Sequence, residues 1–257
     1  MTAADLDLDG DGLRVTGRIR VASNATFLAA IGEVAVVYKP VAGERPLWDF
    51  PDGTLAHREV AAYRVSEALG WDVVPRTWLR DGPLGPGMVQ LWRTPDPEQD
   101  PVDVVPAHDV PRDGWRTVFH GSDESGQRVA LVHEDSAVLR RMAVFDVLVN
   151  NADRKGGHVL PMPDGHRHGV DHGVTFHVEP KLRTVLWGWL GERLDPDELA
   201  GVDRVRAGLD GDLGRGLAEL LSEPELDALA ARCGRLLGEG RFPDHEGDMP
   251  AMPWPLF

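Results

Sequence analysis

Three side chains in the segments NNADRKGGHVL and VDHGVTF have the types and the spacing that are expected of residues in one functional site. Asp153 precedes His158 by five residues, and Asp171 follows His158 by 13. The strand-like stretches HVL and HGV bracket a turn at Asp164-Gly165, so we expect the three side chains to converge at one end of a hairpin. An isolated loop aspartate is usually only solvated. Asp171, however, stands between an apolar lead and Gly173, where a carboxylate is costly unless it is paired or metal-bound.

Lys39 and Glu59 lie upstream and add a cation and a further carboxylate. Lys39 ends the strand-like run VAVVYK, and Glu59 follows 20 residues later near the start of a helical pattern. Each alone has an ordinary explanation, as an exposed strand-end lysine or as a glutamate that suits a helix N-terminus. Phosphoryl transfer needs a cation on the phosphates, carboxylates for metal and a group that takes the nucleophile's proton. The five residues together supply that set.

The elements that must position these residues can be read from the pattern. Residues 13–40 alternate and are rich in Val and Ile, which predicts strands with a hairpin tip at 23–26. The run HREVAAYRVSEALG predicts a helix that Gly70 ends. Two further runs, VVPRTWLRDG and PGMVQLW, complete a predicted five-stranded antiparallel sheet with one main helix over it.

The second half of the chain is predicted to be mostly helical. Residues 94–114 carry five prolines and six acidic residues, which indicates a linker or surface insertion. WRTVFHG and QRVALVH predict a β-hairpin, and Asp135 or Ser136 is expected to cap the following helix. The run EPELDALAARCGRLLG has one apolar stripe, and the tail MPAMPWPLF is expected to dock through Trp254 and Phe257. The predicted fold class is α+β in a single domain, 1–257.

Composition limits the partners that we expect. The net charge of −15, from 42 acidic and 27 basic residues, opposes binding to nucleic acid or to an anionic membrane. Arg140-Arg141 and Arg154-Lys155 are only pairs, far from the roughly four to eight clustered cations of a phosphoinositide surface. The N-terminus lacks a signal-peptide pattern, no apolar run has membrane length, and the lone Cys233 fits a reducing compartment. We therefore expect a cytoplasmic protein without stable membrane association.

These motifs together resemble the phosphatidylinositol 3/4-kinase-like and HipA-type atypical kinases, in particular a small actinobacterial-type branch. The resemblance covers residues 21–176 and lies in the order VYKP, HREVAAYRVSEALG, NNADRK and VDHGVTF. It implies a two-lobed protein-kinase-like fold, with an N-lobe at about 10–93, the insertion at 94–114 and a mostly helical C-lobe at 115–257. It also implies binding of ATP with Mg²⁺ or Mn²⁺, and transfer of the γ-phosphoryl group to a hydroxyl of a protein or small metabolite.

The resemblance also implies roles for particular residues. Lys39 matches the lysine that contacts the α- and β-phosphates, and Glu59 matches its helix partner. Asp153 matches the catalytic-loop aspartate that orients or deprotonates the acceptor hydroxyl, and Asp171 matches the metal-binding aspartate. The phosphate-covering loop falls on Ser23, Asn24, Ala25 and Thr26, and the hinge that holds the adenine edge falls on Val89, Gln90 and Leu91.

The chain departs from the family pattern in two places. The phosphate loop lacks G-x-G-x-x-G, because Gly17 and Gly32 lie outside SNAT. His158 stands where the family generally has Asn. Magnesium prefers oxygen ligands, whereas a neutral imidazole suits manganese, so we predict either a Mn²⁺ preference with His158 as a ligand, or a single-metal site with His158 only hydrogen-bonding the loop.

Further histidines give the stretch after His158 a metal-binding look. His166, His168, His172 and His177 nevertheless lack the C-x-x-C or H-E-x-x-H spacing of a zinc site, so no zinc site is predicted there.

Three functions remain open from the sequence. The first is an active kinase. The second is a pseudokinase that binds ATP or metal without turnover, which His158 and the glycine-poor loop favour. The third is a metal-dependent hydrolase built on Asp153, His158 and Asp171, which leaves Lys39 and Glu59 without a role. Lipid phosphorylation ranks below a protein or metabolite acceptor because the chain is so acidic.

Overall fold

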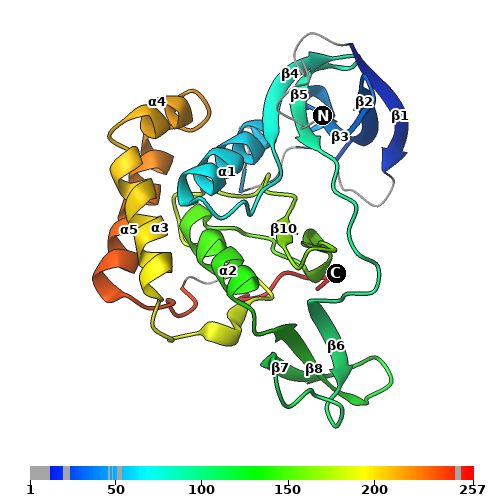
Figure 1. Cartoon of the computed structure of the whole chain (residues 1–257), viewed down its shortest axis with the longest axis vertical. Helices are drawn as coiled ribbons and strands as arrows, with labels where there is room; N and C mark the ends of the chain where they lie inside the picture. The colour runs from blue at the N-terminus through cyan, green and yellow to red at the C-terminus, as the bar shows by residue number, and fades with distance from the viewer. Residues whose placement is uncertain (1–11, 20–23, 46, 48, 51–53, 247–249) are drawn as a thin grey trace.

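The N-terminal part of the molecule is a five-stranded antiparallel sheet (Figure 1). The computed structural model describes residues 12–19, 24–45, 47, 49–50, 54–246 and 250–257. The strand order is β1 (Leu13–Ile19), β2 (Thr26–Ile31), β3 (Val34–Pro40), β5 (Gly85–Leu91) and β4 (Thr77–Gly82). The alternation predicts the five strands but not their order. β3 pairs with β2 on one side and β5 on the other, so the strand that ends in Lys39 is held along both edges.

The helix α1 (Leu55–Leu69) lies between this sheet and the C-terminal helices. Gly70 ends it in the left-handed conformation, with φ of 69°, as predicted. Its first N–H groups are capped from a distance. The Glu44 carboxylate, just after the 3₁₀ turn η1 (Val41–Gly43), accepts from the backbone N–H of Leu55 and Ala56 at 3.1 and 2.8 Å. This cap ties the start of α1 to the end of β3.

A second, three-stranded sheet projects from the rest of the molecule (Figure 1). Its order is β6 (Val102–Pro106), β8 (Arg128–Glu134) and β7 (Trp115–Ser122), and the β7–β8 hairpin is the predicted one. The sequence predicts no strand within residues 94–114, yet β6 forms there. It is an edge strand, and Pro106 at its end is tolerated because an edge strand leaves one side without ladder bonds.

The C-terminal part is helical. It contains α2 (Ala137–Val149), the 3₁₀ turn η3 (Trp187–Trp189), α3 (Pro196–Gly208), α4 (Asp212–Ala218) and α5 (Glu223–Glu239). Ser136 caps α2 as predicted, since its hydroxyl accepts from the Leu139 N–H at 3.2 Å. Both α3 and α5 begin with a capping box and a proline. Among the described residues, no helix combines the length and the apolar character needed to cross a membrane.

A short hairpin and the C-terminal segment complete the fold. The 3₁₀ turn η2 (Gly156–His158) leads into β9 (Val159–Pro161), which pairs with β10 (Arg167–Gly169) around the predicted turn. The C-terminal segment returns to this hairpin, and the Leu256 carbonyl accepts from the Gly156 N–H at 2.8 Å. Phe257 packs against Gly156 so closely that a Cβ there would clash, as the docking prediction requires. Trp254 stays 85% exposed instead.

Candidate active site

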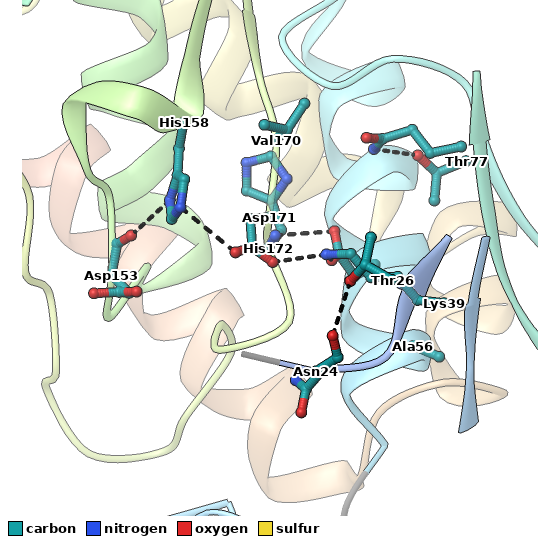
Figure 2. A network of polar contacts seen from close by, with 12 residues as sticks. Asn24, Thr26, Lys39, Ala56, Thr77, Asp153, His158, Val170, Asp171 and His172 are labelled. Carbon is teal, nitrogen blue, oxygen red and sulfur yellow. Dashed lines mark hydrogen bonds and ion pairs between the residues drawn. The ribbon is translucent and has the colours of Figure 1, made fainter. Parts of the chain in front are cut away.

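Lys39 is held between two carboxylates from distant parts of the chain. Its Nζ lies 2.5 Å from Glu59 Oε1 and 2.7 Å from Asp171 Oδ1 (Figure 2). β3 supplies the lysine, α1 supplies Glu59, and the loop after β10 supplies Asp171. Glu59 is almost wholly buried, and its second oxygen accepts from the His172 backbone N–H at 2.9 Å. The structure thus brings together three of the predicted residues.

The charges in this group stabilise one another. Burial alone would lower the pKa of the Lys39 ammonium, but the charges of Asp171 and Glu59 outweigh it and raise that pKa. The Lys39 charge in turn holds the pKa of Asp171 far below its usual range. Burial raises the pKa of Glu59, against the pull of Lys39. Lys39 and Asp171 are therefore both charged at neutral pH.

His158 lies between Asp153 and Asp171 (Figure 2). Its Nδ1 is 3.0 Å from the Asp153 carbonyl oxygen, and its Nε2 is 3.5 Å from Asp171 Oδ2. A carbonyl can only accept, so Nδ1 carries the proton. Burial lowers the pKa of His158, so the ring is neutral and Nε2 presents a lone pair to Asp171. Two acceptors that face each other without a proton between them are a pair that a cation can bridge, so these residues fit a divalent metal.

Asp153 lines the same cleft as Lys39 and Asp171. Its backbone N–H donates to Asn151 Oδ1 at 3.0 Å, and its carboxylate lies 3.5 Å from Lys155 Nζ. Burial and, to a smaller extent, the charge of Asp171 raise the pKa of Asp153, while Lys155 opposes them. Asp153 contacts His158 through its backbone, and its carboxylate points away from the ring (Figure 2). The carboxylate is thus available to a ligand.

The loop that carries Asp153 is anchored by a buried ion pair that sequence reasoning missed. Arg154, with no exposed surface, donates from Nε and Nη2 to the two oxygens of Asp146 in α2, at 2.9 and 2.8 Å. The same guanidinium donates to the carbonyls of His158 and Val170, and Nη2 lies 2.7 Å from His172 Nε2. One signal was present, because Asp146 interrupts the apolar run AVFDVLV and a buried carboxylate there needs a cation.

The predicted phosphate loop lies only partly within the described residues. Ser23 falls outside them. Asn24 and Ala25 line the cleft, and the Asn24 side chain accepts from the Arg45 backbone N–H at 3.0 Å. Thr26 is buried at the start of β2, with its hydroxyl 3.3 Å from the Asn24 carbonyl (Figure 2).

The predicted hinge residues are not brought to this cleft. Val89, Gln90 and Leu91 belong to β5, a central strand that pairs with β3 and β4, so its backbone groups are used in the sheet. The Gln90 side chain is buried and donates to Thr77 Oγ1 at 2.9 Å. The physical reason is strand length, because β5 stays paired to its last residue and leaves no free edge at 89–91.

The cleft measures about 580 Å³, within the range of small-molecule sites. Besides the predicted residues, its lining includes cations and an aromatic side chain that the sequence analysis did not assign to the site: Arg45, Lys155, Arg183 and Trp254. Trp254 comes from the docked C-terminal segment. The cleft therefore combines carboxylates for a cation with cations for an anion.

The fold and the cleft define a mixed α/β protein whose charged site draws on strands, helix and loops. No model of a protein family matches the chain. The chain is 52% identical over 262 residues to Protein Rv2133c of Mycobacterium tuberculosis, and the match covers 97% of this chain and 93% of that protein. The chain therefore belongs to the same family as Rv2133c.

A solved structure with which the chain can be superposed is the crystal structure of the Helicobacter pylori proinflammatory kinase CtkA. The TM-score is 0.48 and the sequence identity 12%, over 90% of this chain and 93% of that one. Similarity at that level carries no argument about function, which rests instead on the geometry of the cleft.

Proposed function

We propose that the protein is an ATP-dependent phosphotransferase with a two-lobed, kinase-like arrangement of the five-stranded sheet and the C-terminal helices. One observation carries the proposal. Lys39 is salt-bridged to both Glu59 and Asp171, and it lines one cleft with Asp153. A lysine fixed by a helix glutamate beside a cation-binding aspartate is what a phosphate chain and its metal require.

Each residue has a distinct role in this proposal. Lys39 binds phosphate oxygens, and Glu59 holds the ammonium in place. Asp171 and His158 hold a divalent cation, which supplies neutralisation of the negative charge on the phosphates. Asp153 orients the acceptor hydroxyl and takes its proton as the oxygen attacks the γ-phosphorus, and ADP leaves. The raised pKa of Asp153 supports this role, because a more basic carboxylate accepts a proton more readily.

His158 supports a preference for Mn²⁺ over Mg²⁺. A neutral imidazole nitrogen suits manganese better, and the buried ring is neutral because its pKa is lowered. We expect His158→Asn to shift the preference toward Mg²⁺ in metal titrations of ATP binding. An unchanged preference would leave His158 only as a hydrogen-bond partner of the loop.

Turnover of labelled ATP tests the proposal directly. The purified protein is incubated with γ-labelled ATP and Mn²⁺ or Mg²⁺, and ADP release and autophosphorylation are followed. We expect Asp153→Asn to lower the rate by about 10²–10⁴-fold while ATP binding persists. The matched control is Asp113→Asn, an exposed aspartate far along the chain from the cleft residues. Equal rates in Asp153→Asn and the control would refute the role of Asp153.

A pseudokinase is the second candidate. Lys39 already occupies one oxygen of Asp171, and an imidazole stands at 158 in place of the amide typical of the family, which suits a binding module as well as an enzyme. ATP binding without turnover in any metal would favour it. Activity on a substrate without nucleotide would instead favour a metal-dependent hydrolase.

A further inference from the structure

Asp72, His166 and His168 form a second cluster of potential metal ligands. One ligand atom from each residue lies within 4.8 Å of those of the other two. Asp72 belongs to the turn between α1 and β4, whereas the histidines belong to the β9–β10 hairpin, 94 and 96 residues later. None of the three lines the cleft that contains Lys39 and Asp171.

The two histidine rings lie against each other. His168 belongs to β10 and His166 immediately precedes that strand, and their rings meet edge to face with centroids 4.5 Å apart. His166 Nε2 lies 2.8 Å and His168 Nδ1 lies 3.0 Å from the Asp72 carbonyl oxygen, and Asp72 Oδ2 lies 4.0 Å from His166 Nε2. The two ring nitrogens thus meet at the Asp72 carbonyl oxygen, and the Asp72 carboxylate lies beside them.

We propose that Asp72, His166 and His168 bind a divalent cation of the zinc class. Ligands at about 2.0–2.1 Å from a tetrahedral ion are about 3.3 Å from one another. The donors here lie within 4.8 Å of one another, and the Asp72 carboxylate is 4.0 Å from His166 Nε2. The Asp72 side chain is 68% exposed, so its carboxylate can rotate toward the ring nitrogens without repacking the core. Two nitrogens and a carboxylate are a donor set that zinc accepts, and one position stays open to water.

Without metal, both rings donate to the Asp72 carbonyl. A cation would bind the rings in their other tautomer, with the lone pair on the nitrogen that faces Asp72.

The ion would join segments that the fold already brings side by side. The Gly169 N–H donates to the Val73 carbonyl at 2.7 Å, next to the cluster on both segments. Asp171 follows His168 by three residues, so a cation here would also steady the hairpin that carries Asp171. Because the folded chain gathers all three ligands, the cation stabilises the folded state by its binding free energy.

Cobalt and zinc binding test the site without nucleotide. We use Asp171→Asn as the background, which removes the carboxylate of the catalytic cleft, and titrate Co²⁺ by visible absorption and Zn²⁺ by calorimetry. We expect one ion per chain, tetrahedral cobalt bands and a raised Tm with Zn²⁺. Asp72→Asn and His166→Gln should each weaken Zn²⁺ binding by more than about 10-fold. His120→Gln, which removes an exposed histidine elsewhere, should not.

Each outcome decides the proposal. Asn tolerates the left-handed backbone of Asp72, with φ of 51°, as well as Asp does, so loss of zinc there reports the carboxylate and not the fold. Zinc binding that survives both variants, or that is absent from the Asp171→Asn background, overturns it. Because no nucleotide is present, this result is independent of whether the cleft transfers phosphate.

Discussion

Two networks of charged and polar side chains meet at consecutive residues, and they differ in how far their side chains are buried. Asp171 belongs to the cleft network with Lys39 and Glu59, and its side chain is 52% exposed. His172 belongs to the anchor network with Arg154 and Asp146, which has no exposed surface. One network can exchange partners with a ligand, whereas the other cannot be reached by one.

The difference shows how burial assigns roles to similar residues. A buried pair contributes little over apolar packing while it is intact, but breaking it leaves an uncompensated charge. An exposed carboxylate can lose its partner at small cost, because water takes over. The anchor network therefore fixes the loop through Arg154, whereas Asp171 in the cleft network can exchange its protein partner for a ligand.

The largest effect is expected from breaking the anchor. Arg154→Ala should lower the free energy of unfolding by about 3–5 kcal/mol, because the Asp146 carboxylate stays buried without its cation. Urea unfolding followed by tryptophan fluorescence measures it. Arg154→Lys keeps the charge but loses the two-pronged contact, so it should fall between wild type and Arg154→Ala. A loss below about 1 kcal/mol in Arg154→Ala would show that the anchor is dispensable.

A pH effect separates His172 from the cleft residues. Burial, and then the charge of Arg154, hold the pKa of His172 well below 6.5. Below pH 6.5 the unfolded chain takes up a proton at this residue and the folded chain does not, so stability falls as the pH falls. The slope is at most about 1.4 kcal/mol per pH unit for one histidine.

His172→Phe should reduce that slope by up to one proton. Urea unfolding at several pH values between 7 and 5 measures the slope, which a general loss of packing would not change. The matched comparison is His177→Phe, since the His177 ring is less buried and its pKa is lowered less completely. Equal slopes for wild type and His172→Phe would contradict a neutral His172 in the anchor.

Asp171→Asn should change stability by less than about 1 kcal/mol, because the carboxylate is half exposed. Asn also tolerates the φ of 63° at this position. Binding of ATP with Mn²⁺ should nevertheless be lost, as calorimetry would show. Retained metal-dependent ATP binding would place the cation elsewhere.

The smallest effect is expected at Trp254, which extends the exchangeable side of the comparison. Trp254→Ala should leave the free energy of unfolding within about 0.5 kcal/mol, because the side chain is 85% exposed. The Kd for ATP should rise by about 2–10-fold, since an aromatic contact contributes about 0.5–1.5 kcal/mol. Phe257→Ala provides the contrast, because Phe257 packs against Gly156 and its removal should lower stability as well. An unchanged Kd in Trp254→Ala would exclude Trp254 from the site.

Local patterns predict much of the fold. The period of residues 57–69 and Gly70 predict α1, and the turn at Asp164-Gly165 predicts the hairpin that brings His158 beside Asp171. β6 escapes prediction because Pro106 at its end, together with the prolines and acidic residues on either side of the strand, is typical of a linker. Such edge strands depend on a partner strand that local sequence does not reveal.

Long-range pairings are harder to predict from one sequence. Nothing near Asp72 indicates that it meets His166 and His168, so the spacing of the histidines alone argued against a zinc site. Likewise, the resemblance assigns a hinge to 89–91, but the pairing of β5 on both sides depends on sheet order. Within the candidate site, the hairpin pattern alone predicts that His158 meets Asp171, whereas the meeting of Lys39, Glu59 and Asp171 from separate elements follows from the motif order that carries the family resemblance.

The ion pair between Asp171 and Lys39 has a thermodynamic consequence. A metal that takes this carboxylate competes with the Lys39 ammonium, and the ammonium it displaces is then available to phosphate oxygens. Phosphate on Lys39 likewise releases Asp171 for the metal. The two ligands should therefore bind with positive cooperativity, and reciprocity requires each to raise the affinity of the other by the same factor.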